Sequence, residues 1–140
     1  MRRVAALAFI LLAAGCGGRT AKHPLTAGVA TSAPPSPPRV TISAPTHHPR
    51  VNATWPVTVR VTNTAAKPIP ATLTMRILFN GTPVGKVDNG RVYHFVGTWR
   101  EKKGQEITWP AASRNQPLQF EAIVHAQHAT VKKTWAIMVR

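Results

Sequence analysis

From Val40 onward, apolar and polar residues alternate in short runs. The apolar positions of the four clearest runs are Val57, Val59 and Val61; Leu73, Met75, Ile77 and Phe79; Leu118, Phe120, Ala122 and Val124; and Val131, Trp135, Ile137 and Val139. Because successive side chains of a strand point to opposite faces, each run predicts a strand with one buried face. Shorter runs predict further strands over residues 40–43, 84–87, 91–96 and 105–109.

The residues between these runs favour turns. Asn-Gly pairs at residues 80–81 and 89–90 are typical of hairpin turns. The sequence KPIP at residues 67–70 breaks the chain between two strong strands, because proline cannot donate to a sheet ladder. No long segment has the apolar period of a helix. The pattern therefore predicts an all-β fold, a single antiparallel β-sandwich of roughly seven or eight strands over residues 39–140.

Three segments of the predicted sandwich resemble the bacterial immunoglobulin-like domains of cell-surface proteins. They are PPRVTI at residues 37–42, WPVTVRVTN at residues 55–63 and TWAIMVR at residues 134–140. The paired cysteines of antibody-type domains are missing, so only the generic sandwich carries over. The resemblance implies a spacer, an adhesion module or a polymer-binding module.

The first residues have the layout of a secretory signal peptide. Arg2 and Arg3 precede an unbroken apolar run at residues 4–12, and small residues follow at positions 13–15. The run is well short of the roughly 20 residues that a membrane-spanning helix needs. We therefore expect residues 1–15 to direct export and then to be removed.

The end of this segment, Leu12-Ala13-Ala14-Gly15-Cys16, resembles the lipobox of bacterial lipoproteins. The family commonly has leucine where Ala13 stands. The resemblance implies that Cys16 carries a diacylglyceryl group and begins the mature chain on the outer side of a bacterial membrane. Two acyl chains suffice for stable anchoring. The whole arrangement is similar to small lipoproteins of high-GC bacteria, and the alternative is a free cysteine near a conventional cleavage site.

Residues 16–38 separate the predicted anchor from the predicted sandwich. They are rich in Pro, Ala, Thr, Ser and Gly and have no apolar period. The PPSPP sequence at residues 34–38 favours extended polyproline geometry and would act as a spacer. A recognition motif for a partner domain is the alternative interpretation of these prolines.

The charge of the chain is strongly positive, with a formal value of +14 at pH 7. Removing residues 1–15 takes away two arginines and leaves 16 basic residues against four acids, a formal charge of +12. Such a chain is attracted to anionic headgroups or envelope polymers, and the attraction weakens as salt rises. Another envelope protein is also a possible partner. Nucleic acid would be attracted by the same physics, but export makes it a less suitable partner.

The most informative candidate for ligand binding is a predicted loop at residues 96–104. It combines Trp99 with Arg100, Lys102 and Lys103. A flat ring with cations beside it can hold a sugar, a base or a phosphate-bearing polymer. The alternative is that Trp99 caps the core while the charges solvate the loop. We interpret Trp55, Trp109 and Trp135 in that second way, as core or core-edge residues.

The supply of catalytic groups is thin. Glu101 and Glu106 are separated by a polar KKGQ sequence that indicates a solvated loop. His125 and His128 could converge across a turn, but no nearby acid or cysteine completes a metal site. We therefore expect no catalytic residues, no cofactor and no metal. The expected function is a lipid-anchored, non-enzymatic binding or structural module, with an electrostatic polymer binder or a small metal-dependent envelope enzyme as alternatives.

Overall fold

The structure is a computed structural model that describes residues 36–140. The predicted signal peptide, Cys16 and nearly all of the predicted linker lie outside the described residues. The strands are β1 (Arg39–Ser43), β2 (Thr54–Trp55), β3 (Thr58–Thr62), β4 (Pro70–Phe79), β5 (Thr82–Lys86), β6 (Tyr93–Val96), β7 (Thr98–Arg100), β8 (Ile107–Thr108), β9 (Pro117–Ala126) and β10 (Ala129–Met138), and two 3-10 turns are η1 (Val87–Gly90) and η2 (Ala111–Ser113).

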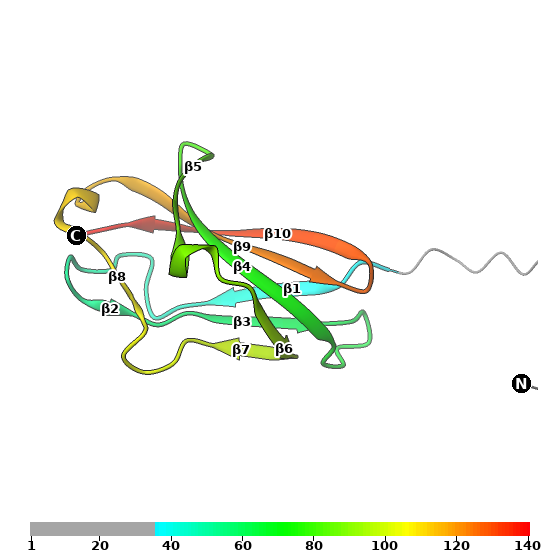
Figure 1. Cartoon of the computed structure of the whole chain (residues 1–140). Coiled ribbons are helices and arrows are strands. Elements are labelled where there is room, and N and C mark those ends of the chain that lie inside the picture. Colours follow the sequence, from blue (N-terminus) through cyan, green and yellow to red (C-terminus); the bar gives the residue numbers. More distant parts are fainter. Residues whose placement is uncertain (1–35) are drawn as a thin grey trace, which may run out of the picture. The chain divides into compact units, whose positions relative to one another are not determined.

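These strands form an all-β sandwich, as the sequence predicts (Figure 1). One sheet has the order β1-β3-β7, and the other has the order β10-β9-β4, with β5 and β6 both paired to the remaining side of β4. A small β2-β8 pair completes the set, and the pairing between all these strands is antiparallel. Figure 1 shows that β1 enters the sandwich at one end and that the chain finishes at the other.

The core lies between the two sheets and takes one side chain in two from the long strands. Val59 and Val61 from β3 meet Leu73 from β4 and Phe120 and Val124 from β9, all with no exposed surface. The four alternating runs are therefore confirmed as strands. The core or core-edge placement of Trp55, Trp109 and Trp135 is confirmed, with the first two buried and Trp135 half-buried against the core. Trp99 is buried as well, which agrees with the alternative interpretation of that residue.

One predicted core position is wrong. The alternation places Phe79 inside, but Phe79 is 36% exposed and its neighbour Leu78 is only 4% exposed. The register of β4 against β5 shifts between Ile77 and Leu78. Such a bulge moves every following side chain to the opposite face, which a strict two-residue period cannot anticipate.

The two Asn-Gly pairs have different outcomes. Residues 80–81 form the predicted hairpin turn between β4 and β5, with positive φ at both positions. Residues 89–90 do not form a hairpin, because β5 and β6 run in the same direction along one side of β4. The chain instead makes a detour through η1, where Asp88 and Asn89 take left-handed backbone angles.

The structure has ten strands in residues 36–140, where the sequence pattern predicts roughly seven or eight. The additional strands are β2 and β7, of two and three residues. Runs this short contain too few alternations to be recognised. The β7 strand is a correction to the predicted loop, because it pairs with β3 and places Trp99 opposite Val59.

Candidate ligand-binding hollow

The four predicted ligand-binding residues occupy two different settings. Trp99 and Arg100 lie on β7, while Lys102 and Lys103 lie in the following loop. Because neighbours on a strand point to opposite faces, Trp99 turns into the core and is 8% exposed, whereas Arg100 faces solvent. The broad ring face expected for ligand stacking is therefore largely covered at Trp99.

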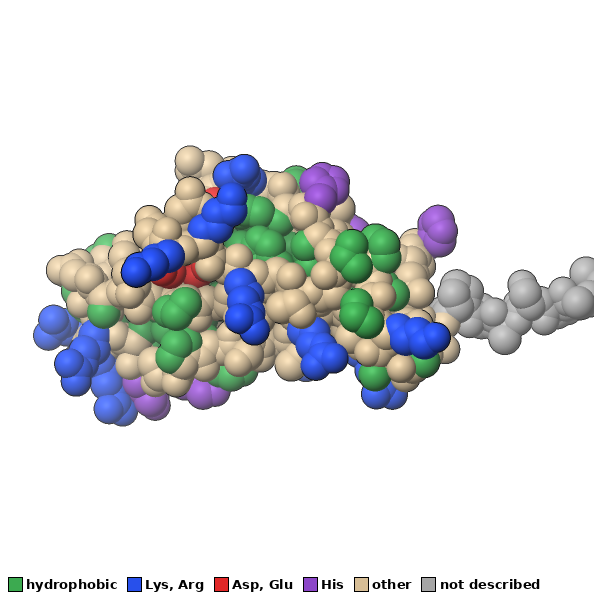
Figure 2. All heavy atoms as spheres, turned by 90° about the horizontal axis from the view of Figure 1, so that it is seen from below, with side chains coloured by type: hydrophobic (Ala, Val, Ile, Leu, Met, Phe, Trp, Pro, Cys, Tyr) green, Lys and Arg blue, Asp and Glu red, His purple; other side chains and the backbone are tan. Residues whose placement is uncertain are grey.

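Three of these residues nevertheless line one cavity, of about 490 Å³, which we call the aromatic hollow. It lies among η1, β6, β7 and the loop after β7. Its principal lining side chains are Asp88, Arg91, Tyr93, Trp99, Arg100, Glu101, Lys102 and Gln105. Lys103 is exposed but does not line it. Figure 2 views the molecule from below, and on this face Lys and Arg side chains occupy several separate places.

Tyr93 supplies the more accessible ring of the aromatic hollow. Its centroid lies 4.9 Å from that of Trp99, with the rings tilted by 50°, and the guanidinium carbon of Arg91 lies 5.3 Å from the Tyr93 centroid. The Tyr93 hydroxyl donates to Oδ2 of Asp88 at 2.6 Å. Burial, together with this hydrogen bond, raises the pKa of Tyr93 to about 12. Tyr93 is therefore a neutral ring held in a fixed position.

Glu101 is the unusual acid of the aromatic hollow. Its Oε2 accepts from the Val57 backbone N–H at 3.0 Å, and its own N–H donates to the Val57 carbonyl at 3.2 Å. Its Oε1 is buried and has no hydrogen-bond partner among the described residues. Burial raises the pKa of Glu101 to about 7, despite the opposing effects of the Val57 and Ile107 backbone N–H groups. Glu101 is thus available in both protonation states near neutral pH.

Sequence reasoning missed Asp88, Arg91 and Tyr93 as site residues and assigned Glu101 to a solvated loop. The chain reaches Asp88 and Tyr93 through the η1 detour, which follows from left-handed backbone angles at Asp88 and Asn89. The only local signal was the Asn-Gly pair at residues 89–90, which indicates a turn but gives no direction.

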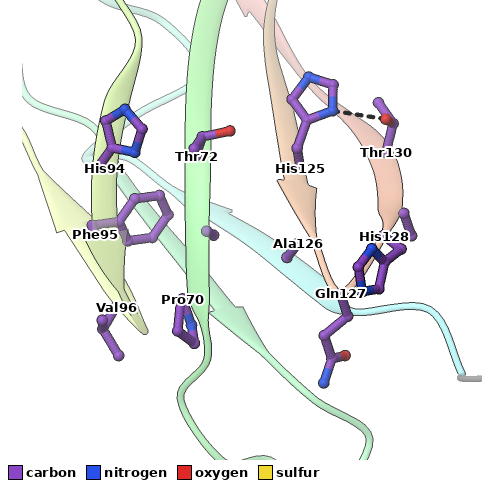
Figure 3. A pocket seen from close by; sticks show the side chains of 12 residues that line it. Pro70, Thr72, His94, Phe95, Val96, His125, Ala126, Gln127, His128 and Thr130 are labelled. Carbon is purple, nitrogen blue, oxygen red and sulfur yellow. Dashed lines mark hydrogen bonds between the residues drawn. The ribbon is translucent and has the colours of Figure 1, made fainter. Parts of the chain in front are cut away.

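Three histidines line a second cavity on the outer face of the larger sheet, and one of them, His94, lines the aromatic hollow as well. His94 and His125 lie on either side of Thr72 of β4, because β6 and β9 both pair with that strand. Together with His128 they line this second cavity, of about 780 Å³. Figure 3 shows the His125 and His128 rings well apart, with His125 hydrogen bonded to Thr130 at 2.8 Å. Within residues 36–140, no group of three or more His, Cys, Asp or Glu side chains is placed to bind a metal ion.

No protein-family model matches this chain, and no curated protein matches it either. In the described part of the chain, no helix has the length and apolar character needed to cross a membrane.

Proposed function

We propose that this chain is a lipid-anchored module of the bacterial cell envelope that binds an acidic polysaccharide in the aromatic hollow. It acts without catalysis, and Cys16 carries the diacylglyceryl anchor. The observation that carries the binding proposal is the convergence of Arg91, Arg100 and Lys102 on one cavity that also contains an aromatic pair.

Each part of the aromatic hollow suits a different part of such a ligand. A sugar ring presents C–H groups to the Tyr93 ring, and its carboxylates or phosphates attract Arg91, Arg100 and Lys102. Exported domains of this type meet such polymers at the cell surface.

The binding proposal is tested with the full chain carrying Cys16→Ser, so that it is purified without an acyl group. Alginate oligomers, which are chains of uronic acids, serve as the probe. The R100Q/K102Q/K103Q variant should bind about tenfold more weakly or worse, with a shallower salt dependence. The matched control is K67Q/K132Q/K133Q, which removes the same charge from exposed positions outside the aromatic hollow. Equal weakening by both variants contradicts a specific site.

The anchor is tested separately, by intact mass and membrane partitioning in a bacterial host. The account expects a mature chain that begins at Cys16, carries added diacylglyceryl mass and partitions with membranes. The Cys16→Ser variant should lose that mass. A soluble, unmodified chain cut elsewhere would make the protein a secreted one and Cys16 incidental.

A second candidate, from a different class, is acid catalysis by Glu101. Its raised pKa and its place beside Asp88 are features of catalytic acids. The candidate is less favoured because both acids already accept hydrogen bonds: Asp88 from the Tyr93 hydroxyl, and Oε2 of Glu101 from the Val57 N–H. Hydrolysis of alginate oligomers by the native chain, lost in Glu101→Gln, would support it. A tightly bound metal, with activity lost on replacing His125 and His128, would favour the metal-dependent alternative.

A further inference from the structure

A second basic surface lies at the end of the sandwich where the chain finishes. The Arg140 N–H donates to the Pro49 carbonyl at 2.8 Å, and the Arg140 carbonyl accepts from the Val51 N–H at 2.8 Å. Bonds from one residue to both neighbours of another are the pattern of a parallel pair. Arg50 and Arg140 therefore lie side by side, although their charges repel.

The same pattern continues back along the chain and adds a histidine. The Met138 N–H donates to the His47 carbonyl at 2.9 Å, which pairs Met138 with His48. Because alternate strand residues share a face, His48, Arg50, Met138 and Arg140 project from one face. All four are exposed. We call His48, Arg50 and Arg140 the arginine end.

His48 of the arginine end also lines a cavity of about 400 Å³, which neither Arg50 nor Arg140 lines. Its floor and walls include His48, Asn80, Gln119, Ala136 and Met138, so it offers amide groups and a small apolar floor. Arg114 bridges to Val139 through the backbone, so its side chain belongs to the face opposite that of Met138 and Arg140 and is not counted in the arginine end.

The arginines at this end have no acidic side chain to balance them. Within residues 36–140 the one salt bridge is Arg76–Glu121, and no Asp or Glu lines the cavity beside the arginine end. Adjacent guanidiniums are unfavourable by themselves, but their fork geometry matches phosphate oxygens.

We propose that the arginine end binds a phosphate-bearing polymer, with Arg50 and Arg140 each contacting a phosphate group. The choice of a polymer over headgroup phosphates rests on the proposed anchor, because β1 enters the sandwich at the opposite end (Figure 1). The arginine end is thus the end of the sandwich farther from the point where the predicted linker joins it. The site is distinct from the aromatic hollow and takes a ligand that needs no sugar ring.

The test uses the full chain carrying Cys16→Ser, with long-chain inorganic polyphosphate as one probe and phosphatidylglycerol/phosphatidylcholine vesicles as the other. The R50Q/R140Q variant should bind polyphosphate at least about tenfold more weakly, since two charge-assisted contacts to phosphate are lost. The matched control K132Q/K133Q removes the same charge from β10, on the order of 25 Å from Arg140. It should change the affinity by less than about threefold, since only long-range attraction is lost.

Two outcomes overturn the proposal: equal weakening by both double variants, or tight binding to vesicles with none to polyphosphate. The R100Q/K102Q/K103Q variant separates this result from the proposed function. It should retain most of its polyphosphate affinity. If alginate does not bind to the aromatic hollow, the polyphosphate experiment still tests the arginine end. Thermal unfolding of each variant checks that the fold is unchanged.

Discussion

Two regions of the molecule each bury a carboxylate group, but only one of them places a cation beside it. On the outer face of the larger sheet, Glu121 of β9 is 5% exposed and forms an ion pair with Arg76 of β4. Beside β7, the Glu101 carboxylate is stabilised by the backbone N–H groups of Val57 and Ile107 and has no cation beside it. The difference is therefore whether a cation accompanies the buried acid.

The comparison separates an ion pair within the larger sheet from an acid without a cation beside a cavity. Arg76 and Glu121 are partners in the register of β4 and β9, so their ion pair links the two central strands of the sheet. Glu101 is also hydrogen bonded to the backbone of Val57, but it has no cation and lies in the wall of a cavity. Unpartnered buried acceptors and raised pKa values gather at functional sites.

The largest effect is expected from leaving Glu121 without its cation. Arg76→Ala should lower the free energy of unfolding by about 2–4 kcal/mol, since an uncompensated buried charge is costly and Arg76 is itself partly exposed. Urea denaturation at pH 7 measures the change. The double variant Arg76→Met/Glu121→Leu serves as the control and should recover most of the loss. A loss below about 0.5 kcal/mol for Arg76→Ala would make the pair an incidental surface contact.

A smaller, pH-dependent effect is expected at Glu101. Its folded pKa of about 7 lies above the ordinary value of 4.5, so the folded state holds the proton more tightly. The stabilisation is present below about pH 4.5 and is lost as the pH rises through about 7. Denaturation midpoints at pH 5 and pH 8 should differ more for the native chain than for Glu101→Gln. Identical differences in the two proteins would mean that Glu101 titrates normally.

The smallest effect on stability is expected at the rim of the aromatic hollow. Tyr93→Phe removes the hydrogen bond to Asp88 and should cost about 0.5–1 kcal/mol while leaving alginate binding nearly unchanged. Tyr93→Ala also removes the ring and should weaken alginate binding several-fold. Calorimetric titration and thermal unfolding of both variants separate the two roles. If Tyr93→Ala and the native chain bind alginate with equal affinity, the Tyr93 ring does not contact the ligand.

Sequence pattern predicts the long strands well because their side chains alternate over many positions. It predicts β4 only as far as Ile77, since the bulge after that residue depends on pairing with β5. It cannot predict that Arg76 meets Glu121, because the contact joins strands far apart in the chain.

The candidate site was predictable only in part. Arg100 and Lys102 are recognisable as cations beside a tryptophan, and the cavity does include them. The burial of Trp99 depends on pairing of β7 with β3, and the arrival of Tyr93 depends on the η1 detour. Both depend on contacts between segments that are distant in the sequence, and no local apolar pattern predicts them.

The most direct test of the central claim is a nuclear magnetic resonance titration of the labelled full chain carrying Cys16→Ser with alginate oligomers. The account predicts that the largest shift changes cluster at the aromatic hollow, on Tyr93, the Trp99 indole and the backbone of Glu101 and Lys102. Shift changes confined to the arginine end, or spread evenly over the exposed lysines and arginines, would contradict a specific ligand site in the aromatic hollow.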